Sequence, residues 1–390
     1  MKDVKISDYL WFQEGPGVRN TQYTTSGVKL INVANLVDGN VDLSTSDRYI
    51  SEEEAYGKYN HFLADDGDFV IASSGIKIDY FDKKMGFIKK EHLPLCMNTS
   101  CIRFKVLDTN NLEIKYFMYY LKSNSFKKQL FNQITGSAQL NFGPSHLKKM
   151  TFPLIELKEQ KRIIERLDKT QNIINETKYL LSKYDTLIKS RFIEMFGDPV
   201  TNSKNWNLKK LGDLLESIRY GTSTPPVFSK TGYAFIRATN IKKGKIVNDD
   251  MKYISEEETK KISKCILNGN EILIVRSGVN SGDTCVVTKE YINQYAGYDM
   301  ILVLGNQINP IYLNELLNTN YMEKMIKPLT RRAAQPHLNS EQTQSLPIIL
   351  PPLSLQNDFA AFVQQIDKSK FVIWRNLELC VIIIQKVFLL

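Results

Sequence analysis

Two long stretches of the chain carry residues suited to burial at alternating spacings of four and three positions. This is the heptad spacing of a coiled-coil seam, in which one stripe of a helix faces a partner helix. In the first stretch the seam positions are Ile163, Leu167, Thr170, Ile174, Thr177, Leu181, Tyr184, Ile188, Arg191 and Met195. In the second they are Phe359, Val363, Ile366, Lys370, Ile373, Leu377, Cys380, Ile384 and Val387. The pattern predicts two long helices that pair in antiparallel orientation.

The alternative is that each stretch forms an amphipathic helix that lies on its own domain. Length favours the coiled coil, because each run is about ten turns and the mean globular helix has about three. Gly197 and Pro199 are expected to end the first helix, since glycine is favoured just after a helix and proline cannot continue one. At about 1.5 Å per residue, each helix would span roughly 50 Å.

Outside these stretches, apolar residues form short runs that are rich in β-branched residues and bounded by Gly, Asp and Asn, which is typical of strands. Such runs occupy residues 28–36, 68–74, 272–277 and 285–290. Two further segments, residues 114–131 and 311–326, place apolar residues at helical spacing. The sequence therefore predicts an α+β fold, with mixed helix and strand before each long helix.

The same short motifs occur twice along the chain and in the same order. The repeated pairs are residues 29–41 with 234–246, 49–54 with 253–258, 67–75 with 270–278, 138–139 with 334–335, and 152–157 with 346–353. A repeat spacing of about 200 residues indicates a duplicated domain, since solenoid repeats run about 20–50 residues. Two copies of one binding unit suggest a target that itself has two parts.

The repeat and the heptad pattern together predict the domain organisation. We expect a first domain at residues 1–155, a central helix at 156–197, a second domain at 198–353 and a C-terminal helix at 354–390. The fold class is α+β, with two similar domains separated by the two long helices.

Composition narrows the class of protein. With 51 Lys and Arg against 42 Asp and Glu, the net charge of +9 leans mildly toward a polyanionic partner without proving one. Five scattered cysteines imply no disulfide framework and favour a reducing cytoplasm. No signal peptide is expected, because the start of the chain has no apolar run with a basic flank. The apolar stretch at residues 379–390 is too short to cross a bilayer and is expected to pack against another helix.

Four motifs carry a resemblance to a known family. They are SRFIEMFGDP at residues 190–199, GSAQLNFGPSHLKKMTFPL at 136–154, EQKRIIERLDK at 159–169 and IDKSKF at 366–371. Together with the duplication and the long helices, they make the sequence resemble the specificity subunit of type I restriction–modification systems over essentially the whole chain.

The resemblance implies two target-recognition domains, each contacting one part of a bipartite, asymmetric DNA site. It also implies that the helices dock two modification subunits, which are adenine methyltransferases, and that the full complex adds two restriction subunits. No cofactor is then expected in this chain, because S-adenosylmethionine, ATP and Mg²⁺ belong to the partner subunits. Half-sites on one face of B-DNA lie about 34 Å apart or a multiple of that, which suits helices of roughly 50 Å.

DNA recognition needs cations for phosphates, and side chains with donors and acceptors for base edges. In the first copy we expect these contacts from Arg19, Asn20, Ser73, Ser74, Lys77, Gln139 and Asn141. In the second copy we expect them from Thr222, Thr224, Arg276, Ser277, Asn280, Arg331, Arg332, Gln335 and His337. Arg276 and the Arg331–Arg332 pair are the strongest candidates, because Arg can engage guanine bidentately. The bland alternative for each residue is an ordinary solvated loop position, as it is for Lys148, Lys149, Lys242, Lys243 and Lys245 as phosphate contacts.

Catalytic motifs are missing from the sequence. The segment STPPVF at residues 223–228 has Thr224 where an amino-methyltransferase needs Asn or Asp, and no P-loop or glycine-rich cofactor loop is present. His92, Cys96 and Cys101 are loosely spaced for zinc. Two alternatives stay open. A fused or stand-alone restriction–modification enzyme predicts S-adenosylmethionine binding or DNA cleavage by the chain alone, and a protein scaffold predicts no salt-dependent DNA binding.

Overall fold

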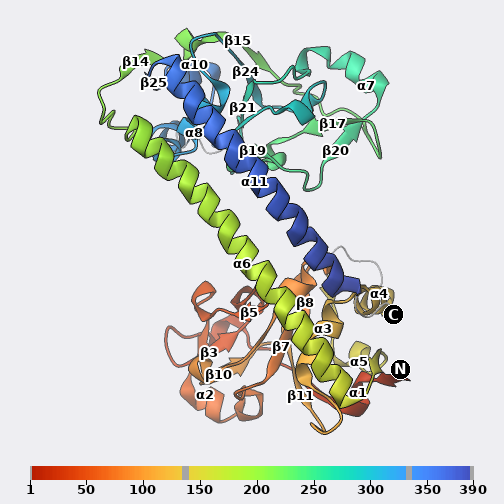
Figure 1. The fold of residues 1–390 in the computed structure, drawn as a ribbon. Helices are drawn as coiled ribbons and strands as arrows, with labels where there is room; N and C mark the ends of the chain where they lie inside the picture. Colours follow the sequence, from red (N-terminus) through yellow and green to blue (C-terminus); the bar gives the residue numbers. More distant parts are fainter. Residues whose placement is uncertain (1, 134–139, 331–335, 387–390) are drawn as a thin grey trace. The chain divides into compact units, whose positions relative to one another are not determined.

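The computed structural model describes residues 2–133, 140–330 and 336–386, which form two units (Figure 1). Unit 1 comprises Met1–Lys178 and Trp374–Leu390, and unit 2 comprises Tyr179–Ile373. Each unit therefore contains one copy of the repeat together with one half of each long helix.

The elements of the two units follow each other in a similar order. The strands of unit 1 are β1 (Lys2–Lys5), β2 (Leu10–Glu14), β3 (Val28–Ile31), β4 (Leu36–Val37), β5 (Asn40–Val41), β6 (Tyr49–Ile50), β7 (Phe69–Ala72), β8 (Ser74–Ile76), β9 (Met85–Phe87), β10 (Leu95–Met97), β11 (Cys101–Val106), β12 (Leu140–Asn141) and β13 (Thr151–Leu154). Its shorter helices are α1 (Ile6–Tyr9), α2 (Glu52–Tyr56), α3 (Ile114–Lys122), α4 (Asn124–Gln133) and α5 (Pro144–Leu147).

The strands of unit 2 are β14 (Asn207–Lys210), β15 (Leu215–Tyr220), β16 (Phe228–Ser229), β17 (Tyr233–Ile236), β18 (Ile241–Lys242), β19 (Lys245–Ile246), β20 (Lys252–Ile254), β21 (Ile272–Ile274), β22 (Thr284–Val286), β23 (Tyr295–Ala296), β24 (Met300–Leu304) and β25 (Pro347–Leu350). Its shorter helices are α7 (Glu256–Lys261), α8 (Pro310–Leu317), α9 (Lys327–Thr330) and α10 (Ser340–Gln344). The long helices are α6 (Leu157–Phe196) and α11 (Leu353–Lys386).

In the described residues both units share their sheet topology, except that the second sheet of unit 2 has the additional edge strand β16. The main sheet is antiparallel, with the order β2-β11-β7-β9 in unit 1 and β15-β24-β21-β22 in unit 2. A second sheet contains one parallel pair in each unit, β10 beside β3 and β23 beside β17. A third pairing joins the first and last strands of each copy, β1 with β13 and β14 with β25. The repeated motifs therefore reflect two domains with one topology.

Aromatic side chains form much of both cores, and buried rings contribute more apolar area than any other residue type. In unit 1 the Phe104 ring lies 6.0 Å from that of Phe69 and 5.4 Å from that of Phe117. In unit 2 the Phe196 ring from α6 lies 4.8 Å from that of Tyr312 in α8. The long helices are thus part of the cores and do not merely connect them.

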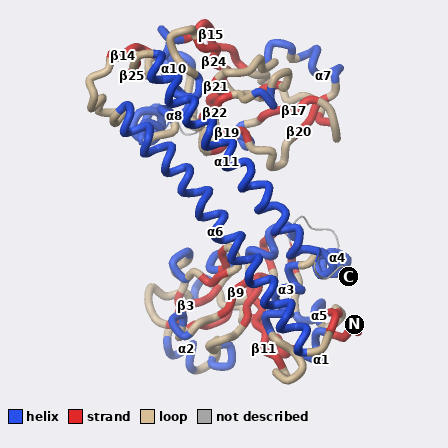
Figure 2. Tube along the Cα trace, viewed as in Figure 1, coloured by secondary structure: helices blue, strands red, loops and turns tan. Residues whose placement is uncertain are grey.

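The two long helices pack together through the seam positions that the heptads predict. Figure 2 shows α6 and α11 as the two long helical segments of the backbone trace. Every predicted seam position in the described part of the chain is buried or partly buried, and Val387 lies outside the described residues. In unit 2 the Phe192 ring near the end of α6 lies 5.5 Å from the Phe359 ring near the start of α11, which fixes an antiparallel direction. Lys370, a charged seam position, forms an ion pair with Asp185 on the facing helix.

In unit 1 the first half of α6 meets the last turns of α11. Leu167 and Ile174 share one buried core with Ile384, and Leu377 and Cys380 pack against it. The expected fold class, two similar domains with a pair of long antiparallel helices, is confirmed.

A buried glutamine fastens the start of α6 to its own domain. The Gln160 side chain is fully buried, and its Oε1 accepts a hydrogen bond of 2.9 Å from the backbone N–H of Glu113. Its Nε2 donates to the backbone oxygens of Asn111 and Ile155, both at 2.8 Å. Three hydrogen bonds therefore fix the angle at which the helix leaves the domain.

The start of α11 carries an equivalent arrangement, and we call each buried glutamine with its three backbone hydrogen bonds a glutamine clip. Gln356 is fully buried, and its Oε1 accepts from the backbone N–H of Asn309 at 2.8 Å. Its Nε2 donates to the oxygens of Pro351 at 2.8 Å and Gln307 at 3.3 Å. The two glutamines hold equivalent backbone groups, so the domain–helix joint is duplicated together with the domains.

Two shorter helices differ from the sequence prediction. The helix expected over residues 114–131 is two helices, α3 and α4, because the Ser123 hydroxyl accepts from the backbone N–H of Phe126 and caps a new start. The helix expected over residues 311–326 is likewise interrupted after Leu317, and a π-helical turn follows at Met322–Ile326. Polar side chains that bind the backbone locally thus break both patterns.

The apolar end of the chain packs in unit 1 as far as the structure describes it, with Ile384 in the core. Among the described residues, no helix combines the length and the apolar character that crossing a membrane requires.

Candidate nucleic-acid interface

In unit 2, the loop that follows β21 brings several predicted DNA contacts together. Ser277 forms an isolated antiparallel bridge with His337, and its hydroxyl lies 2.8 Å from His337 Nδ1. The backbone N–H of Leu338 donates to the oxygen of Arg276 at 2.8 Å. Arg276, Ser277 and His337 are therefore neighbours, although the two segments are far apart in the sequence.

Arg276 lies between two tyrosine rings. Its guanidinium carbon is 4.6 Å from the centre of the Tyr220 ring and 4.7 Å from that of Tyr298, within cation–π distance of both. Tyr220 ends β15, and Tyr298 precedes β24, the strand that pairs with β15. Both rings are exposed to solvent over part of their surface.

Asp299 lies beneath this cluster and is buried. Its Oδ1 accepts from the backbone N–H of Arg276 at 3.3 Å. Burial raises the pKa of Asp299 to about 6, against a smaller lowering by Arg276. The Asp299 carboxyl beside the arginine therefore takes up a proton at a higher pH than an exposed aspartate does.

The other unit 2 candidates border the same cluster. Thr222 follows Gly221, whose N–H donates to the oxygen of Asp299 at 2.9 Å, and the Thr222 hydroxyl donates to the oxygen of Thr224 at 2.8 Å. The backbone oxygen of Asn280 accepts from the N–H of Asp283 at 2.9 Å and shapes the loop tip.

In unit 1, the segments that match the loop after β21 and the segment of His337 form a short pair of strands. Strand β12 pairs with β8, and Asn141 stands opposite Ser74. Lys77 follows β8 and is exposed. Ser74, Lys77 and Asn141 thus come together, and Ser74 and Asn141 match Ser277 and His337 of unit 2.

Ser73, one of the predicted DNA contacts, is not on the surface of the described unit. It is fully buried, and its hydroxyl donates to the backbone oxygen of Thr99 at 3.4 Å. The hydroxyl also lies near Glu14, whose pKa is raised by burial and lowered to a smaller degree by Ser73. In the described unit, Ser73 therefore packs inside the domain and binds the backbone at Thr99.

Arg19 and Asn20 are exposed but belong to another part of unit 1. The neighbouring Val18 packs into a separate small core with Val28 and Ile50. In the described ranges, no hydrogen bond joins Arg19 or Asn20 to the β8–β12 ladder.

Four candidates lie outside the described residues, namely Gln139, Arg331, Arg332 and Gln335. Of the candidate phosphate-binding lysines, Lys242 and Lys245 form ion pairs with Asp249 and Asp367. Lys148, Lys149 and Lys243 are exposed.

Sequence reasoning missed four residues of these clusters, Tyr220, Tyr298, Asp299 and Glu14. One signal was available. Gly15 and Gly221 directly follow β2 and β15, and a side chain on either would collide with backbone atoms. The residue before each glycine, Glu14 or Tyr220, therefore has a fixed place at the end of the strand.

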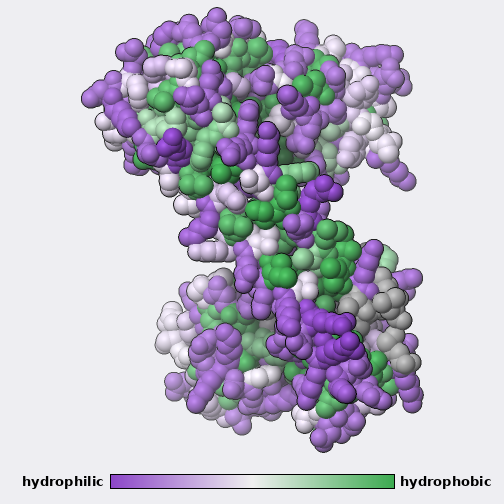
Figure 3. Space-filling model, viewed as in Figure 1, coloured by the Kyte–Doolittle hydropathy of each residue, from purple (hydrophilic) through white to green (hydrophobic). Residues whose placement is uncertain are grey.

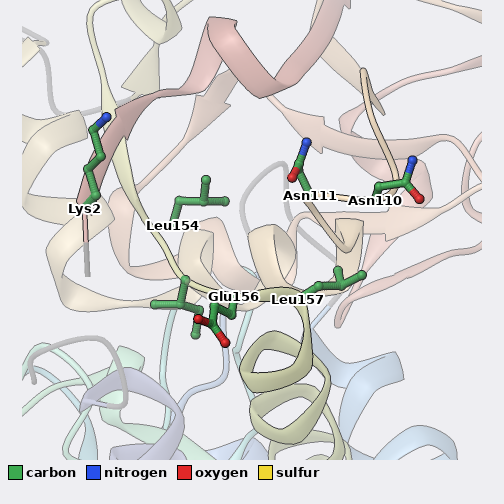
Figure 4. A pocket seen from close by; sticks show the side chains of 7 residues that line it. Lys2, Asn110, Asn111, Leu154, Glu156 and Leu157 are labelled. Atoms are coloured by element: carbon green, nitrogen blue, oxygen red, sulfur yellow. The ribbon is translucent and has the colours of Figure 1, made fainter.

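The described residues contain no group of three or more His, Cys, Asp or Glu side chains that could hold a metal ion. Burial raises the pKa of Cys96 and of Cys101 to about 12, so both thiols stay protonated. Each unit has a shallow pocket beside the start of its long helix, and none of the predicted DNA contacts lines either one. Figure 4 shows the pocket of unit 1, with Lys2 and Asn111 on different segments of its rim.

Comparison with known families places both copies in one class. Residues 18–181 and residues 203–377 each match the family described as Type I restriction modification DNA specificity domain.

Two curated relatives carry corresponding names. The chain is 21% identical over 318 residues to the Type I restriction enzyme EcoKI specificity subunit of Escherichia coli (strain K12), covering 77% of this chain and 67% of that protein. It is 27% identical over 175 residues to the Type I restriction enzyme MjaVIII specificity subunit of Methanocaldococcus jannaschii, covering 44% of this chain. That alignment spans 39% of the relative's length.

A solved structure shares the fold. The crystal structure of the Type-I restriction-modification system S subunit from M. genitalium superposes with a TM-score of 0.52. The match covers 99% of this chain and 96% of that one, at 15% sequence identity.

Proposed function

The chain belongs to the family of type I restriction–modification DNA specificity domains, and we propose that it is the DNA-recognition subunit of such a system. Each unit would read one half of a bipartite DNA target. The observation that carries this proposal is the double match to the specificity domain, at residues 18–181 and 203–377. Two copies with one topology but different loop side chains suit a target with two different halves.

The proposed recognition domains are residues 1–155 and 198–353, with helices at 156–197 and 354–390. In the second domain, Arg276, Ser277 and His337 converge at one loop, with Thr222, Thr224 and Asn280 beside it. In the first, Ser74, Lys77 and Asn141 occupy the matching place. We propose these loops as the DNA-contacting surface of each domain.

Catalysis is assigned to partner subunits. The sequence offers no methyltransferase or nucleotide-binding motif, and the family is one of specificity domains. Methylation with S-adenosylmethionine, and cleavage with ATP and Mg²⁺, would then belong to modification and restriction subunits. The complex would act in the cytoplasm, where the DNA is.

The long helices are the proposed docking sites for two modification subunits. Outside the seam, α11 exposes Trp374, Leu379, Ile382 and Ile383 within unit 1. Within unit 2, α6 exposes Leu180, Leu187 and Ile193. Figure 3 shows apolar surface over the long helices. Exposed apolar side chains gathered on a helix are typical of protein interaction sites.

The proposal can be tested by mapping adenine methylation in genomic DNA. Cells that carry this chain and its methyltransferase subunit are compared with cells that lack this chain only. We expect a split motif that is methylated only when the chain is present. Exchanging residues 206–345 for the matching segment of another family member should change one half of the motif and leave the other half intact.

The same preparation separates the alternatives. Methylation or cleavage by the purified chain alone would favour a fused or stand-alone enzyme. A complex whose DNA binding does not weaken with salt would favour a protein scaffold, since phosphate contacts release counterions. Genomes with identical methylation in the presence and absence of the chain would refute the proposal.

A further inference from the structure

Unit 2 has a cationic cluster at the end of its main sheet that unit 1 lacks. We define the Tyr–Arg–Tyr stack as Tyr220, Arg276 and Tyr298, with Arg276 between the two rings. Tyr220 is the last residue of β15, and Tyr298 lies two residues before β24, the strand that pairs with β15, so the sheet places both rings at the same edge. A guanidinium held in this way loses little conformational freedom when it binds a ligand.

The guanidinium of Arg276 forms no ion pair with the residues that the structure describes. Its Nε is buried without a hydrogen-bond partner, and no described carboxylate forms an ion pair with its guanidinium. The Asp299 side chain is near, but it bonds only the backbone N–H of Arg276, and its Oδ2 is also buried without a partner. An arginine that serves stability normally pairs its buried nitrogen atoms. Arg276 therefore has donors available for an external acceptor.

The backbone around the stack is the same in both units. Gly221 donates to the oxygen of Asp299 at 2.9 Å, and Gly15 donates to the oxygen of Cys101 at 3.1 Å. The adjoining loop is held by the pairing of Ser277 with His337 in unit 2, and of Ser74 with Asn141 in unit 1.

The side chains on this common frame have diverged. Strand register places Glu14 where unit 2 has Tyr220, and Ser73 where unit 2 has Arg276. Unit 1 thus has a carboxylate and a buried hydroxyl in the place of the stack. A position that keeps its backbone and changes its chemistry between two copies is suited to distinguishing two half-sites.

We infer that Arg276 determines base specificity in unit 2 by donating to the O6 and N7 atoms of a guanine, with Tyr220 and Tyr298 as positioning residues. The inference rests on the proposed function of the chain. Arginine is the side chain whose planar fork matches the two acceptors of guanine in the major groove. Val279, three residues along the same loop, is 94% exposed, so the loop tip projects from the unit. The half-site read by unit 2 therefore contains a guanine that the half-site read by unit 1 does not need.

The experiment uses methylation mapping in cells that carry the methyltransferase subunit with the wild-type chain or with Arg276→Lys or Arg276→Gln. The half-site of unit 2 is first identified by the exchange of residues 206–345. Arg276→Lys keeps the charge but loses the fork, so it tests base reading with little risk to folding. We expect discrimination at one guanine of that half-site to fall by about ten- to a hundredfold, with the other half-site unchanged.

The contribution of the two tyrosines is measured in the same methylation experiment. Tyr220→Leu and Tyr298→Leu keep apolar contact but remove the ring faces, and each should relax the same guanine position less than Arg276→Lys does. Arg237→Lys is the matched control, because Arg237 is paired with Asp250 in the same unit. It should leave the motif unchanged.

Different outcomes would refute the DNA-recognition function of the chain and the reading of guanine by Arg276. If the wild-type chain directs no split motif, the proposed function fails. If the motif appears but the unit 2 half lacks guanine, or Arg276→Lys leaves it unchanged, this inference alone fails. A loss of affinity that is uniform across sequences, with a smaller salt slope, would make Arg276 a phosphate contact and also overturn it.

Discussion

A buried carboxylate directly precedes β7 in unit 1 and β21 in unit 2, namely Asp68 and Glu271. Each forms an ion pair with an arginine, but the two arginines come from strands that do not correspond. In unit 1, Arg103 on β11 binds Asp68 at 3.0 Å. In unit 2, Arg219 on β15 binds Glu271 at 3.2 Å. Position 301, which matches Arg103 in register, is an isoleucine.

The rest of each network is equivalent. Arg103 also donates to the backbone oxygens of His61 and Leu63. Arg219 donates to the oxygens of Lys264 and Ile266, which occupy the same places in the repeat. The comparison teaches that the fold specifies a buried cation at this point in space and leaves open which strand supplies it. The two solutions differ in depth, because the Arg103 side chain is 5% exposed and that of Arg219 is 26% exposed.

Removing the deeper arginine should have the largest effect on stability. Arg103→Met leaves the Asp68 charge buried and two backbone oxygens without donors, so we expect a loss of about 4 kcal/mol in the free energy of unfolding. Arg219→Met should cost about 2 kcal/mol, because water reaches this site more easily. Urea denaturation of both variants measures the difference. Equal losses would contradict the contrast in depth.

The comparison can be sharpened by moving the unit 2 arrangement into unit 1. Gln13 faces Arg103 in register and is the match of Arg219. The double variant Gln13→Arg, Arg103→Ile should therefore recover at least half of the stability that Arg103→Met loses. A double variant no more stable than the single one would mean that the strands are not interchangeable sources of the cation.

The next largest effect is expected at the duplicated clips. Gln160→Ala and Gln356→Ala each remove three hydrogen bonds and leave buried backbone groups unpaired, which should cost about 3 and about 2 kcal/mol respectively. The smaller value for Gln356 follows from its longer bond of 3.3 Å to Gln307. Denaturation curves measure both, and Gln365→Ala, an exposed position on α11, is the control that should change stability by no more than about 0.5 kcal/mol. If either variant changes the free energy of unfolding as little as the control does, the clips do not stabilise the fold.

A pH difference between the units follows from Asp299. Because burial raises its pKa to about 6, the folded state binds more protons than the unfolded state between about pH 4 and pH 6. The stability of unit 2 should therefore fall as pH rises through this window. Asp299→Asn should remove the fall and raise the free energy of unfolding at pH 7 by about 2–3 kcal/mol, since each unit of pKa corresponds to about 1.4 kcal/mol.

Unit 1 provides the internal reference for this effect. Cys101 occupies the matching place, and burial raises its pKa to about 12, so it stays neutral throughout the window. Thermal unfolding of wild type and Asp299→Asn between pH 4 and pH 8 is the measurement. Parallel pH profiles for the two proteins would show that Asp299 titrates normally.

The smallest effect on stability is expected on the exposed face of α11. Leu379 is 60% exposed, so Leu379→Asp should change the free energy of unfolding by no more than about 0.5 kcal/mol. It should nevertheless weaken capture of the modification subunit about tenfold, since a charge would enter a desolvated contact. Co-purification measures this, with Glu378→Gln on the same helix as the control. Undiminished capture would exclude this face as the docking site.

The long helices were predictable because their pattern persists over many turns. Even the polar seam position Lys370 was located correctly, and its ion pair with Asp185 explains why lysine is tolerated there. The break between α3 and α4 was not predictable from periodicity, because one hydroxyl on Ser123 decides it. Local hydrogen bonds of this kind compete with helix at a level that apolar spacing does not record.

The candidate interface was predictable only in part. Loop position and residue type singled out Arg276, and the structure brings it beside Ser277 and His337. Its tyrosine partners could not be inferred, because only strand register shows that Tyr220 and Tyr298 flank it. Ser73 lies between β7 and β8 with its side chain fully buried, and neither residue type nor sequence position indicates that burial.

The duplicated glutamine clip has a consequence for how such a gene can change. Gln160 and Gln356 grip equivalent backbone groups, so the joint between a domain and the helix that follows it is standardised. A crossover that joins the first domain to the second helix, or the reverse, would keep the same joint. A single recombination event can therefore combine one domain with a different second domain. The new chain would keep the hydrogen bonds that hold each domain to its helix.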